Sequence, residues 1–377
     1  MDNCSPVTWK IDKATFLRWK KIFSDIAGKG VAAPMEGMEE KEWVDFLIAQ
    51  RILPFYYSAC SDLGNLGSDG ALKKCLKENY IRFLASNEIY TSHARETLHA
   101  MNRAGIIPLV VKGVQLQRMV YPKPELRPTS DLDIVVNDKE EYCAALDVMK
   151  SLCYNRISYR RESYARNILK EIVFVPPPGG RIKVELHHSL RFGQWDKRRR
   201  TDEPFLRESS MTASEEGGIR FCGLADPANF LYLSYHAFQS HTNVKSVLWV
   251  NDLRLLRKSV DLSQRSNIWT LAEETGTDRH CRFGLELLDE LEKEGGSLPS
   301  CVEDSCDLRQ VADEKLFVEF RNVESVPKKM LWLIWFLFPE YQYLRQKYGR
   351  ERNPIFIYSK HIAGIFRGFF RAGKLNG

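Results

Sequence analysis

The sequence predicts an α+β fold, in which a small mixed β-sheet is framed by helical regions on both sides. Apolar side chains recur at helical spacing over residues 1 to about 105, and again from residue 226 to about 345. Between these regions, β-branched apolar runs at 106–111 and 131–136 have the composition of buried strands. This change of period in mid-chain favours an α+β fold over an all-helical one.

The N-terminal region is predicted to contain two main helices. Residues 41–57 carry apolar side chains at helical spacing, with Pro54 near the end of that helix. A long helical pattern follows over residues 72–103, and Gly105 closes it, since glycine commonly follows the last turn of a helix.

The central region is predicted to alternate strands and helices. The strand at 106–111 ends at Lys112-Gly113, and residues 114–120 have the pattern of a short helix. A second strand begins at Asp131. Residues 138–152 then predict a helix whose first turn is acidic, which suits the positive end of a helix dipole.

A hairpin is predicted next, because two apolar runs, 171–175 and 181–187, flank a turn rich in proline and glycine. The polar segment 194–218 is predicted to be a loop and a domain boundary. The expected organisation is therefore a helical N-terminal region (1–105), a mixed-sheet core (106–215) and a helical C-terminal domain (216–377).

The composition is that of an ordinary globular protein, with 44% hydrophobic and 28% charged residues among 377. A formal net charge of +6 does not by itself indicate nucleic acid, and it suits an anionic ligand such as a nucleotide. Nine cysteines without paired short spacings favour reduced thiols in a cytoplasmic protein. No signal peptide is expected, and the apolar run 330–338 is too short to span a bilayer, which predicts a buried helix.

The most informative motif is Asp131-Leu-Asp133, at the start of a predicted strand. Residues i and i+2 of a strand point to the same face, so the two carboxylates can converge while Leu132 and Ile134 enter a core. Two ionised carboxylates side by side repel each other unless a cation lies between them. Mg²⁺ prefers carboxylate oxygens together with substrate phosphates, so the motif indicates metal-dependent chemistry on a phosphate.

Two further features belong with the aspartates. Lys112-Gly113 ends a strand before a short helix, where glycine lets the backbone approach a phosphate and the helix terminus offers N–H groups. Glu185 lies in an apolar strand, where a buried carboxylate needs a partner. Three carboxylates suit a two-metal phosphoryl-transfer site. Taken alone, Gly113 could simply be a turn glycine, and Lys112 or the Asp-x-Asp motif could simply be a solvated strand end.

Taken in order, these motifs resemble a family. Leu109-Val-Val-Lys112-Gly113, Arg127-x3-Asp131-Leu-Asp133 and Val184-Glu185-Leu-His187 resemble poorly characterised bacterial nucleotidyltransferases of the polymerase-β superfamily. The resemblance covers roughly residues 85–260.

The resemblance implies a nucleotidyltransferase-type sheet core and transfer of a nucleoside monophosphate (NMP) from a nucleoside triphosphate (NTP) to an unidentified acceptor. That acceptor would be a small molecule, a peptide or a protein. Asp131, Asp133 and Glu185 would be catalytic and would hold Mg²⁺ or Mn²⁺. Lys112, Gly113 and Arg127 would bind the nucleotide.

The phosphate turn departs from the wider superfamily, which has Gly-Ser or Gly-Gly where this chain has Gly113-Val114. The hydroxyl that often contacts phosphate is absent, and Lys112 is the candidate to replace it. The departure motivates an alternative function, a catalytically degenerate nucleotide-binding or scaffold protein.

Several other residues have two interpretations. Arg127 either clamps a phosphate or pairs with a carboxylate. His187 shares a face with Glu185 and either orients it, meets substrate or is a core residue. His236, His241 and Asp252 could form a metal-dependent hydrolase site. However, an i, i+5 pair of histidines does not share a helical face, so packing roles are favoured.

Two basic segments complete the sequence. Lys197–Arg200 is interpreted as a solvated loop, with binding of an anionic acceptor as the minority interpretation. The basic C-terminal segment predicts an amphipathic helix that packs on its own domain, with contact to an anionic membrane as the alternative. Nucleic acid is not the expected partner.

Overall fold

The computed structural model describes residues 11–67, 70–156, 171–180, 182–190, 203–207, 211–239, 246–259, 265–294, 302–303, 326–339, 341, 344 and 353–373. The chain divides into two compact units, and the division passes through one strand of the sheet. The first unit comprises residues 1–133 and 203–306, and the second comprises residues 134–202 and 307–377.

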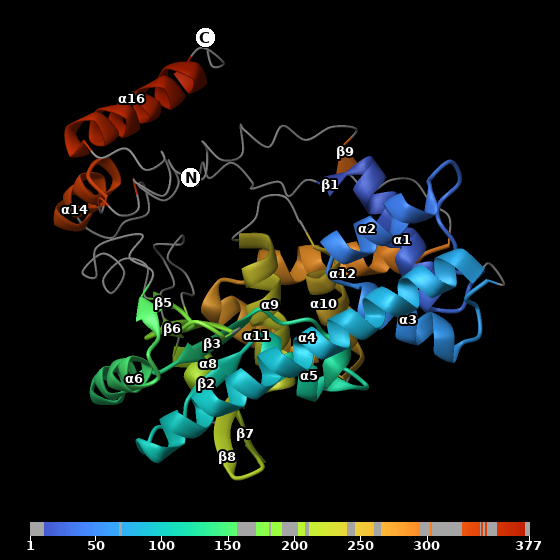
Figure 1. The fold of residues 1–377 in the computed structure, drawn as a ribbon, viewed down its shortest axis with the longest axis horizontal. Helices are drawn as coiled ribbons and strands as arrows, with labels where there is room; N and C mark the ends of the chain where they lie inside the picture. The colour runs from blue at the N-terminus through green and yellow to red at the C-terminus, as the bar shows by residue number, and fades with distance from the viewer. Residues whose placement is uncertain are drawn as a thin grey trace. The chain divides into compact units, whose positions relative to one another are not determined.

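A mixed seven-stranded sheet confirms the predicted α+β class, with the strand order β4-β5-β6-β3-β2-β8-β7 (Figure 1). Strands β2 and β8 are parallel, whereas β4–β5, β5–β6 and β7–β8 are antiparallel pairs. The strands are β2 (Leu109–Val111), β3 (Asp131–Val135), β4 (Asn155–Arg156), β5 (Glu171–Val175), β6 (Lys183–His187), β7 (Met211–Glu216) and β8 (Ile219–Leu224).

Helices make up most of the first unit. They are α1 (Lys13–Ile26), α2 (Glu40–Ala49), α3 (Leu53–Asp62), α4 (Gly70–Arg103), α5 (Gly113–Met119), the 3₁₀ turn η1 (Pro124–Leu126), α8 (Glu203–Leu206), α9 (Asp226–Gln239), α10 (Val247–Ser259), α11 (Arg265–Thr275) and α12 (Asp278–Glu292). Large side chains such as Trp19, Trp43 and Tyr56 are fully buried between the N-terminal helices. A short parallel pair joins β1 (Ile11–Asp12) to β9 (Val302–Glu303).

The predicted single helix over residues 41–57 is wrong, because the chain breaks between α2 and α3. Arg51 adopts a positive φ of 56°, and Pro54 lies in the first turn of α3. Proline lacks a backbone N–H and is favoured at a helix start, so Pro54 begins a new helix rather than ending the old one. The long helix closed by Gly105 is confirmed as α4, and Gly105 has a φ of 80°.

The predicted loop over residues 194–218 is wrong in two places, because α8 is a short helix within it and β7 forms an antiparallel hairpin with β8 through Gly217-Gly218. Strand β7 lies at the end of the strand order, and its sequence Met-Thr-Ala-Ser-Glu-Glu is polar. Edge strands are often polar, since this blocks pairing with other chains. Because β7 is polar, its sequence lacks the apolar pattern from which a strand is predicted. The division of the chain at residues 105 and 215 stays a prediction.

The second unit contains the end of β3, the strands β4 to β6, and the helices α6 (Lys139–Ser151), α14 (Val326–Leu337) and α16 (Pro354–Gly373). The helix predicted over 138–152 is confirmed as α6, with Glu140 and Glu141 in its acidic first turn, and Asp138 caps it by accepting hydrogen bonds from their backbone N–H groups. The helix expected over residues 330–338 is present as α14. The expectation that it is buried is wrong in part, since Trp332 is buried whereas Met330 and Ile334 are exposed.

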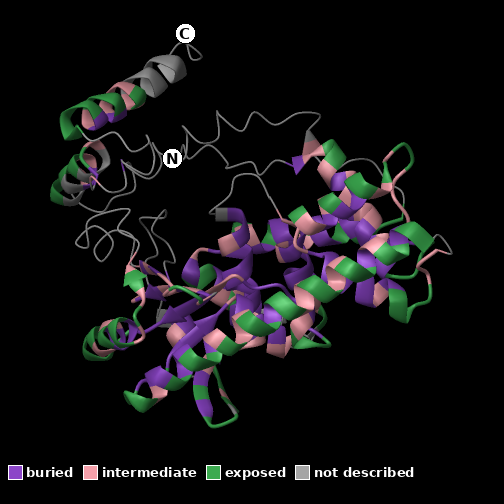
Figure 2. Ribbon diagram, viewed as in Figure 1, coloured by how far each residue is buried: buried purple, intermediate pink, exposed green. Residues whose placement is uncertain are grey.

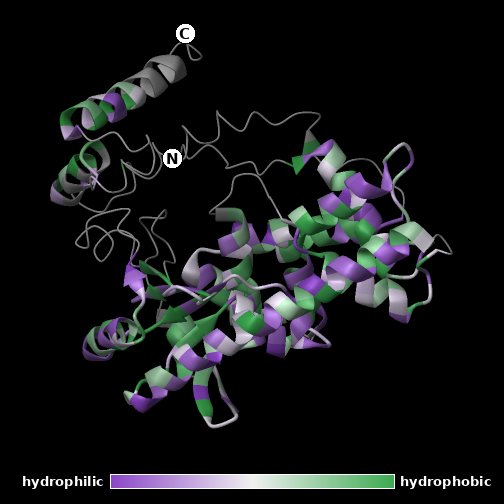
Figure 3. Cartoon of the chain, viewed as in Figure 1, coloured by the Kyte–Doolittle hydropathy of each residue, from purple (hydrophilic) through white to green (hydrophobic). Residues whose placement is uncertain are grey.

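Burial and hydropathy agree over β2, which is buried in Figure 2 and hydrophobic in Figure 3. They differ over β3, where Asp133 is buried although it is hydrophilic. The cysteines that the structure describes are free thiols. Among the described helices, none combines the length and the apolar character that crossing a membrane requires.

Candidate metal and nucleotide site

Strand β3 carries both aspartates of the Asp-x-Asp motif. Leu132 and Ile134 are fully buried, as predicted, and Asp133 is almost as inaccessible, with 3% of its surface exposed. Asp131 is half-buried at the first position of the strand, and its backbone carbonyl accepts a hydrogen bond from the Thr129 hydroxyl at 3.0 Å. The strand therefore holds Asp133 inside the fold, where an ionised carboxylate needs a cationic partner.

The β5–β6 hairpin supplies the second part of the site. Alternation places Lys183, Glu185 and His187 on one face of β6, while Val184 and Leu186 are fully buried on the other. In the antiparallel register, Glu171 of β5 lies opposite His187. One face of β6 thus packs into the apolar core, and the other carries ionisable groups, beside Glu171 of β5.

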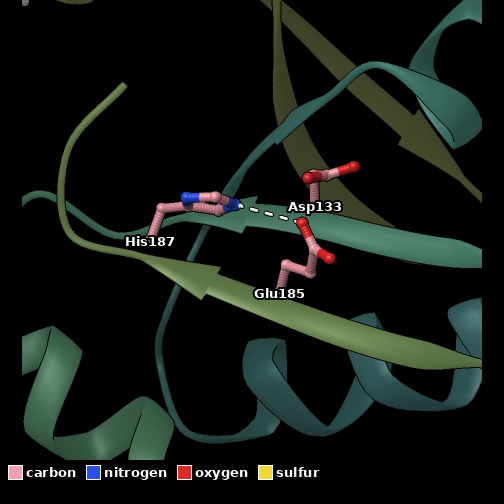
Figure 4. A group of neighbouring side chains, drawn as sticks. All are labelled: Asp133, Glu185 and His187. Carbon is pink, nitrogen blue, oxygen red and sulfur yellow. Dashed lines mark ion pairs between the residues drawn. The ribbon is translucent and has the colours of Figure 1, made fainter. Parts of the chain in front are cut away.

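Three side chains meet where β6 adjoins β3. The backbone N–H of Val136 donates to the carbonyl of His187 at 2.9 Å, which fixes the two strands next to each other. One ligand atom each from Asp133, Glu185 and His187 lie within 4.8 Å of one another (Figure 4). Among the described residues, this is the group that could hold a metal ion, and Asp131 is not a member of it.

The donor set fits a divalent cation. Ligand atoms about 2.1 Å from an octahedral ion lie roughly 3 to 4.2 Å apart, so only small side-chain shifts are needed. Glu185 Oε2 and His187 Nε2 are already 4.0 Å apart. Two carboxylates suit Mg²⁺ or Mn²⁺, and the imidazole favours Mn²⁺ or another transition metal over Mg²⁺.

A second carboxylate lies close to His187. The Nδ1 of His187 lies 3.6 Å from Glu171 Oε2, on the side of the ring away from Glu185. In protein metal sites, a ligating histidine commonly directs its other nitrogen to a carboxylate, which fixes the tautomer and the ring orientation. The Glu171–His187 pair has this arrangement.

Two lysines contact the same carboxylates. Lys112 Nζ lies 2.6 Å from Asp133 Oδ1, and Lys183 Nζ lies 2.6 Å from Glu185 Oε1. The site therefore carries positive charge from the chain itself, beside the groups that would bind a cation.

The turn before α5 is tightly built. A Cβ atom at Gly113 would come within 2.5 Å of Thr129 Oγ1 and 3.3 Å of Arg127 Nη1, so any side chain here would force Thr129 to move. Lys112, just before it, has φ 58° and ψ −126°, a backbone conformation in which glycine is favoured. The predicted close approach at Gly113 is thus made to the side chains of Thr129 and Arg127.

Comparison with protein families identifies the chain. Residues 36–292, more than half of the chain, match the family described as uncharacterised nucleotidyltransferase. The protein belongs to this nucleotidyltransferase family. The match includes every residue of the candidate site. A search of curated proteins finds no match to this nucleotidyltransferase-family chain.

Among solved structures, the family member is similar to an antigenic nucleotidyltransferase-like protein from Paracoccidioides brasiliensis. The two chains are 14% identical, with a TM-score of 0.33. The similarity covers 53% of this chain and 93% of the other.

Arg127 of this nucleotidyltransferase-family protein pairs with a carboxylate, which was one of its two interpretations. Its Nε and Nη2 donate to the two oxygens of Asp252 at 2.9 and 2.8 Å, and both residues are buried. The Tyr121 hydroxyl donates to Asp252 Oδ1 at 2.7 Å. Burial tends to lower the pKa of Arg127, but the adjacent Asp252 carboxylate raises it overall, so the guanidinium stays charged.

Two of the three residues considered for a metal-dependent hydrolase site make packing and ion-pair contacts instead. His236 packs edge-on against Trp249 at 5.7 Å between ring centroids, and Asp252 is held by Arg127. His241 lies outside the described residues. Helix packing, the favoured interpretation for His236, agrees with this contact.

Sequence reasoning did not identify Lys183 and Glu171, and it did not treat His187 as a metal ligand. One signal was available, because Lys183, Glu185 and His187 alternate along a single strand and must share its face. Glu171 could be found only from the hairpin register, which pairs it with His187.

Proposed function

We propose that this protein is a metal-dependent nucleotidyltransferase that transfers NMP from NTP to an acceptor and releases pyrophosphate. The observation that carries the proposal is the convergence of Asp133, Glu185 and His187 in a member of a nucleotidyltransferase family. Carboxylates at hydrogen-bonding distance from lysines, on adjacent strands, can hold both a cation and the phosphates that accompany it.

In the proposed reaction, an acceptor oxygen attacks the α-phosphorus and the bond to the β-phosphate oxygen breaks. Pyrophosphate leaves with the bonding electron pair, and the proton of the acceptor hydroxyl passes to water. When bound, a Mg²⁺ or Mn²⁺ ion would neutralise the charge that develops on the phosphates and activate the attacking oxygen.

The chain's own residues have distinct roles in this proposal. Asp133 and Glu185 hold the cation, with Asp131 beside them, and His187 completes the ligand set in the orientation fixed by Glu171. Lys112 and Gly113 face the triphosphate. The Arg127 guanidinium packs beside Gly113 and stabilises the turn before α5.

The test measures pyrophosphate release by the full-length protein with each of the four NTPs, in the presence of Mg²⁺ or Mn²⁺ and candidate acceptors. Asp133→Asn and Asp131→Ala should abolish release. The matched control is Asp147→Ala, which removes an exposed carboxylate on α6 that pairs with the exposed Lys150. Wild-type turnover in Asp133→Asn would eliminate the proposal.

The same assay distinguishes NMP transfer from the alternative function, a nucleotide-binding scaffold. Metal-dependent NTP binding without turnover, across small-molecule, peptide and protein acceptors, would instead support a nucleotide-binding scaffold. The atypical turn at Lys112-Gly113 is the feature that motivates this second candidate.

A further inference from the structure

The two carboxylates that would hold the metal each contact a lysine, but the two pairs differ in burial. In the Lys112–Asp133 pair the side chains are 13% and 3% exposed. In the Lys183–Glu185 pair they are 35% and 19% exposed. Water screens the second pair more than the first, so the Lys112–Asp133 attraction is the stronger of the two.

Lys112 reaches Asp133 from an unusual backbone position. With φ at 58° and ψ at −126°, it occupies a region where a Cβ atom is unfavourable and glycine is not. The turn alone would therefore be better served by glycine. The ion pair with Asp133 is a specific interaction that the lysine side chain adds at this position.

A metal ion and this ammonium compete for the same carboxylate. Lys112 Nζ lies 2.6 Å from Asp133 Oδ1, whereas a Mg²⁺ or Mn²⁺ ion binds a carboxylate oxygen at about 2.1 Å. A metal ion on Asp133 Oδ1 would compete directly with the ammonium for that oxygen, and one on Oδ2 would lie roughly 4 to 6 Å from it, where like charges inside a protein still repel. The Lys112 ammonium therefore weakens metal binding to Asp133 for as long as it stays on that carboxylate.

We propose that Lys112 is a tethered cation that couples metal binding to nucleotide binding. Its ammonium exchanges between Asp133 and the triphosphate oxygens as the metal and the NTP bind together. The triphosphate gives the displaced ammonium a new anionic partner, so each ligand strengthens binding of the other. This inference rests on the proposed function for the identity of the anion, and it makes Lys112 a coupling residue rather than a simple phosphate contact.

The experiment measures Mn²⁺ affinity by electron paramagnetic resonance of the free ion, using the full-length protein. Titrations are run with and without an NTP analogue whose α,β-bridging oxygen is replaced by a methylene group. Lys112→Met removes the charge and keeps the chain length. Lys112→Gly also relieves the backbone conformation, so agreement between the two variants assigns the effect to the ammonium.

We expect both variants to bind Mn²⁺ alone at least about tenfold more tightly than the wild type, because a nearby unit charge is removed. The gain in Mn²⁺ affinity that the analogue produces should shrink correspondingly. Lys183→Met is the matched control, and its more exposed pair should give a smaller change.

Unchanged Mn²⁺ affinity in both Lys112 variants, or an equal gain in Lys183→Met, would overturn the inference. Pyrophosphate release measured in parallel distinguishes this from failure of the proposed function. If the wild type releases pyrophosphate but the Lys112 variants bind Mn²⁺ no more tightly than the wild type, only the coupling role of Lys112 is overturned. If the Lys112 variants bind Mn²⁺ more tightly but the wild type releases no pyrophosphate, the result supports Lys112 as a tethered cation and eliminates NMP transfer as the function.

Discussion

The buried pair of Arg127 and Asp252 offers the sharpest prediction about the structure around the site. Two parallel hydrogen bonds join the guanidinium to the carboxylate, and Tyr121 donates a third to Asp252. Arg127 is 5% exposed and Asp252 is 0% exposed. Asn87 and Gln117 hold the backbone carbonyl of Arg127 separately, so a side-chain substitution leaves the main chain anchored.

The magnitude follows from burial. Asp252→Ala leaves a charged guanidinium without its anion in a site closed to water, which costs about 3–5 kcal/mol of folding free energy. Domains are typically stable by roughly 5–15 kcal/mol, so this loss is large. Tyr121→Phe removes the hydrogen bond to the charged Asp252 and also the hydroxyl that accepts from Asn251 Nδ2, so it should cost at least about 1.5–3 kcal/mol.

Urea unfolding followed by circular dichroism measures these free energies at pH 7. The double variant Arg127→Leu with Asp252→Leu should lose about 2 kcal/mol less than the sum of the losses measured in Arg127→Leu and in Asp252→Leu separately, since only the double variant leaves no charge unpaired. Losses below about 1 kcal/mol in Asp252→Ala, or strictly additive losses in the double variant, would refute the assignment of a buried ion pair.

Three other predictions concern single positions. Burial lowers the pKa of His280 from 6.5 to about 4, so the unfolded state takes up a proton first. The free energy of unfolding should therefore fall as pH decreases from 6.5 towards 4, and His280→Gln should flatten this dependence in urea titrations. Burial raises the pKa of Cys60 to about 12, whereas Cys143 is exposed. Peptide mass spectrometry should find N-ethylmaleimide on Cys143 well before Cys60, and equal rates would contradict the burial. Gly113→Ala forces a contact with Thr129 Oγ1 and should cost about 1–3 kcal/mol in urea unfolding, whereas Gly70→Ala has open space and should not destabilise.

Periodicity predicted the elements that build the site. Local spacing of apolar residues predicted the Asp131 strand, the short helix after Gly113 and the 171–187 hairpin. This spacing can be seen directly in the sequence. The errors arose where local pattern and tertiary context disagree. Apolar side chains recur at helical spacing across the whole of 41–57, so only the backbone at Arg51 shows where one helix ends.

The composition of the site was predictable in part, for a physical reason. Residues that alternate on one strand share a face by covalent geometry, so Glu185 and His187 could be placed together. Contacts between strands depend on register, and the pairs Lys112–Asp133 and Glu171–His187 join residues from different elements. The partner of Arg127 lies 125 residues further along the chain, which no local pattern encodes.

The central claim is that Asp133, Glu185 and His187 bind one divalent ion, and pulsed electron paramagnetic resonance of bound Mn²⁺ tests it most directly. We predict one Mn²⁺ per chain in the presence of the nucleotide analogue, with a nitrogen coupling from the His187 imidazole. His187→Gln should remove that coupling, and Asp133→Asn should weaken binding of the ion itself. Bound Mn²⁺ without a nitrogen coupling, or with a coupling that persists in His187→Gln, would contradict the site.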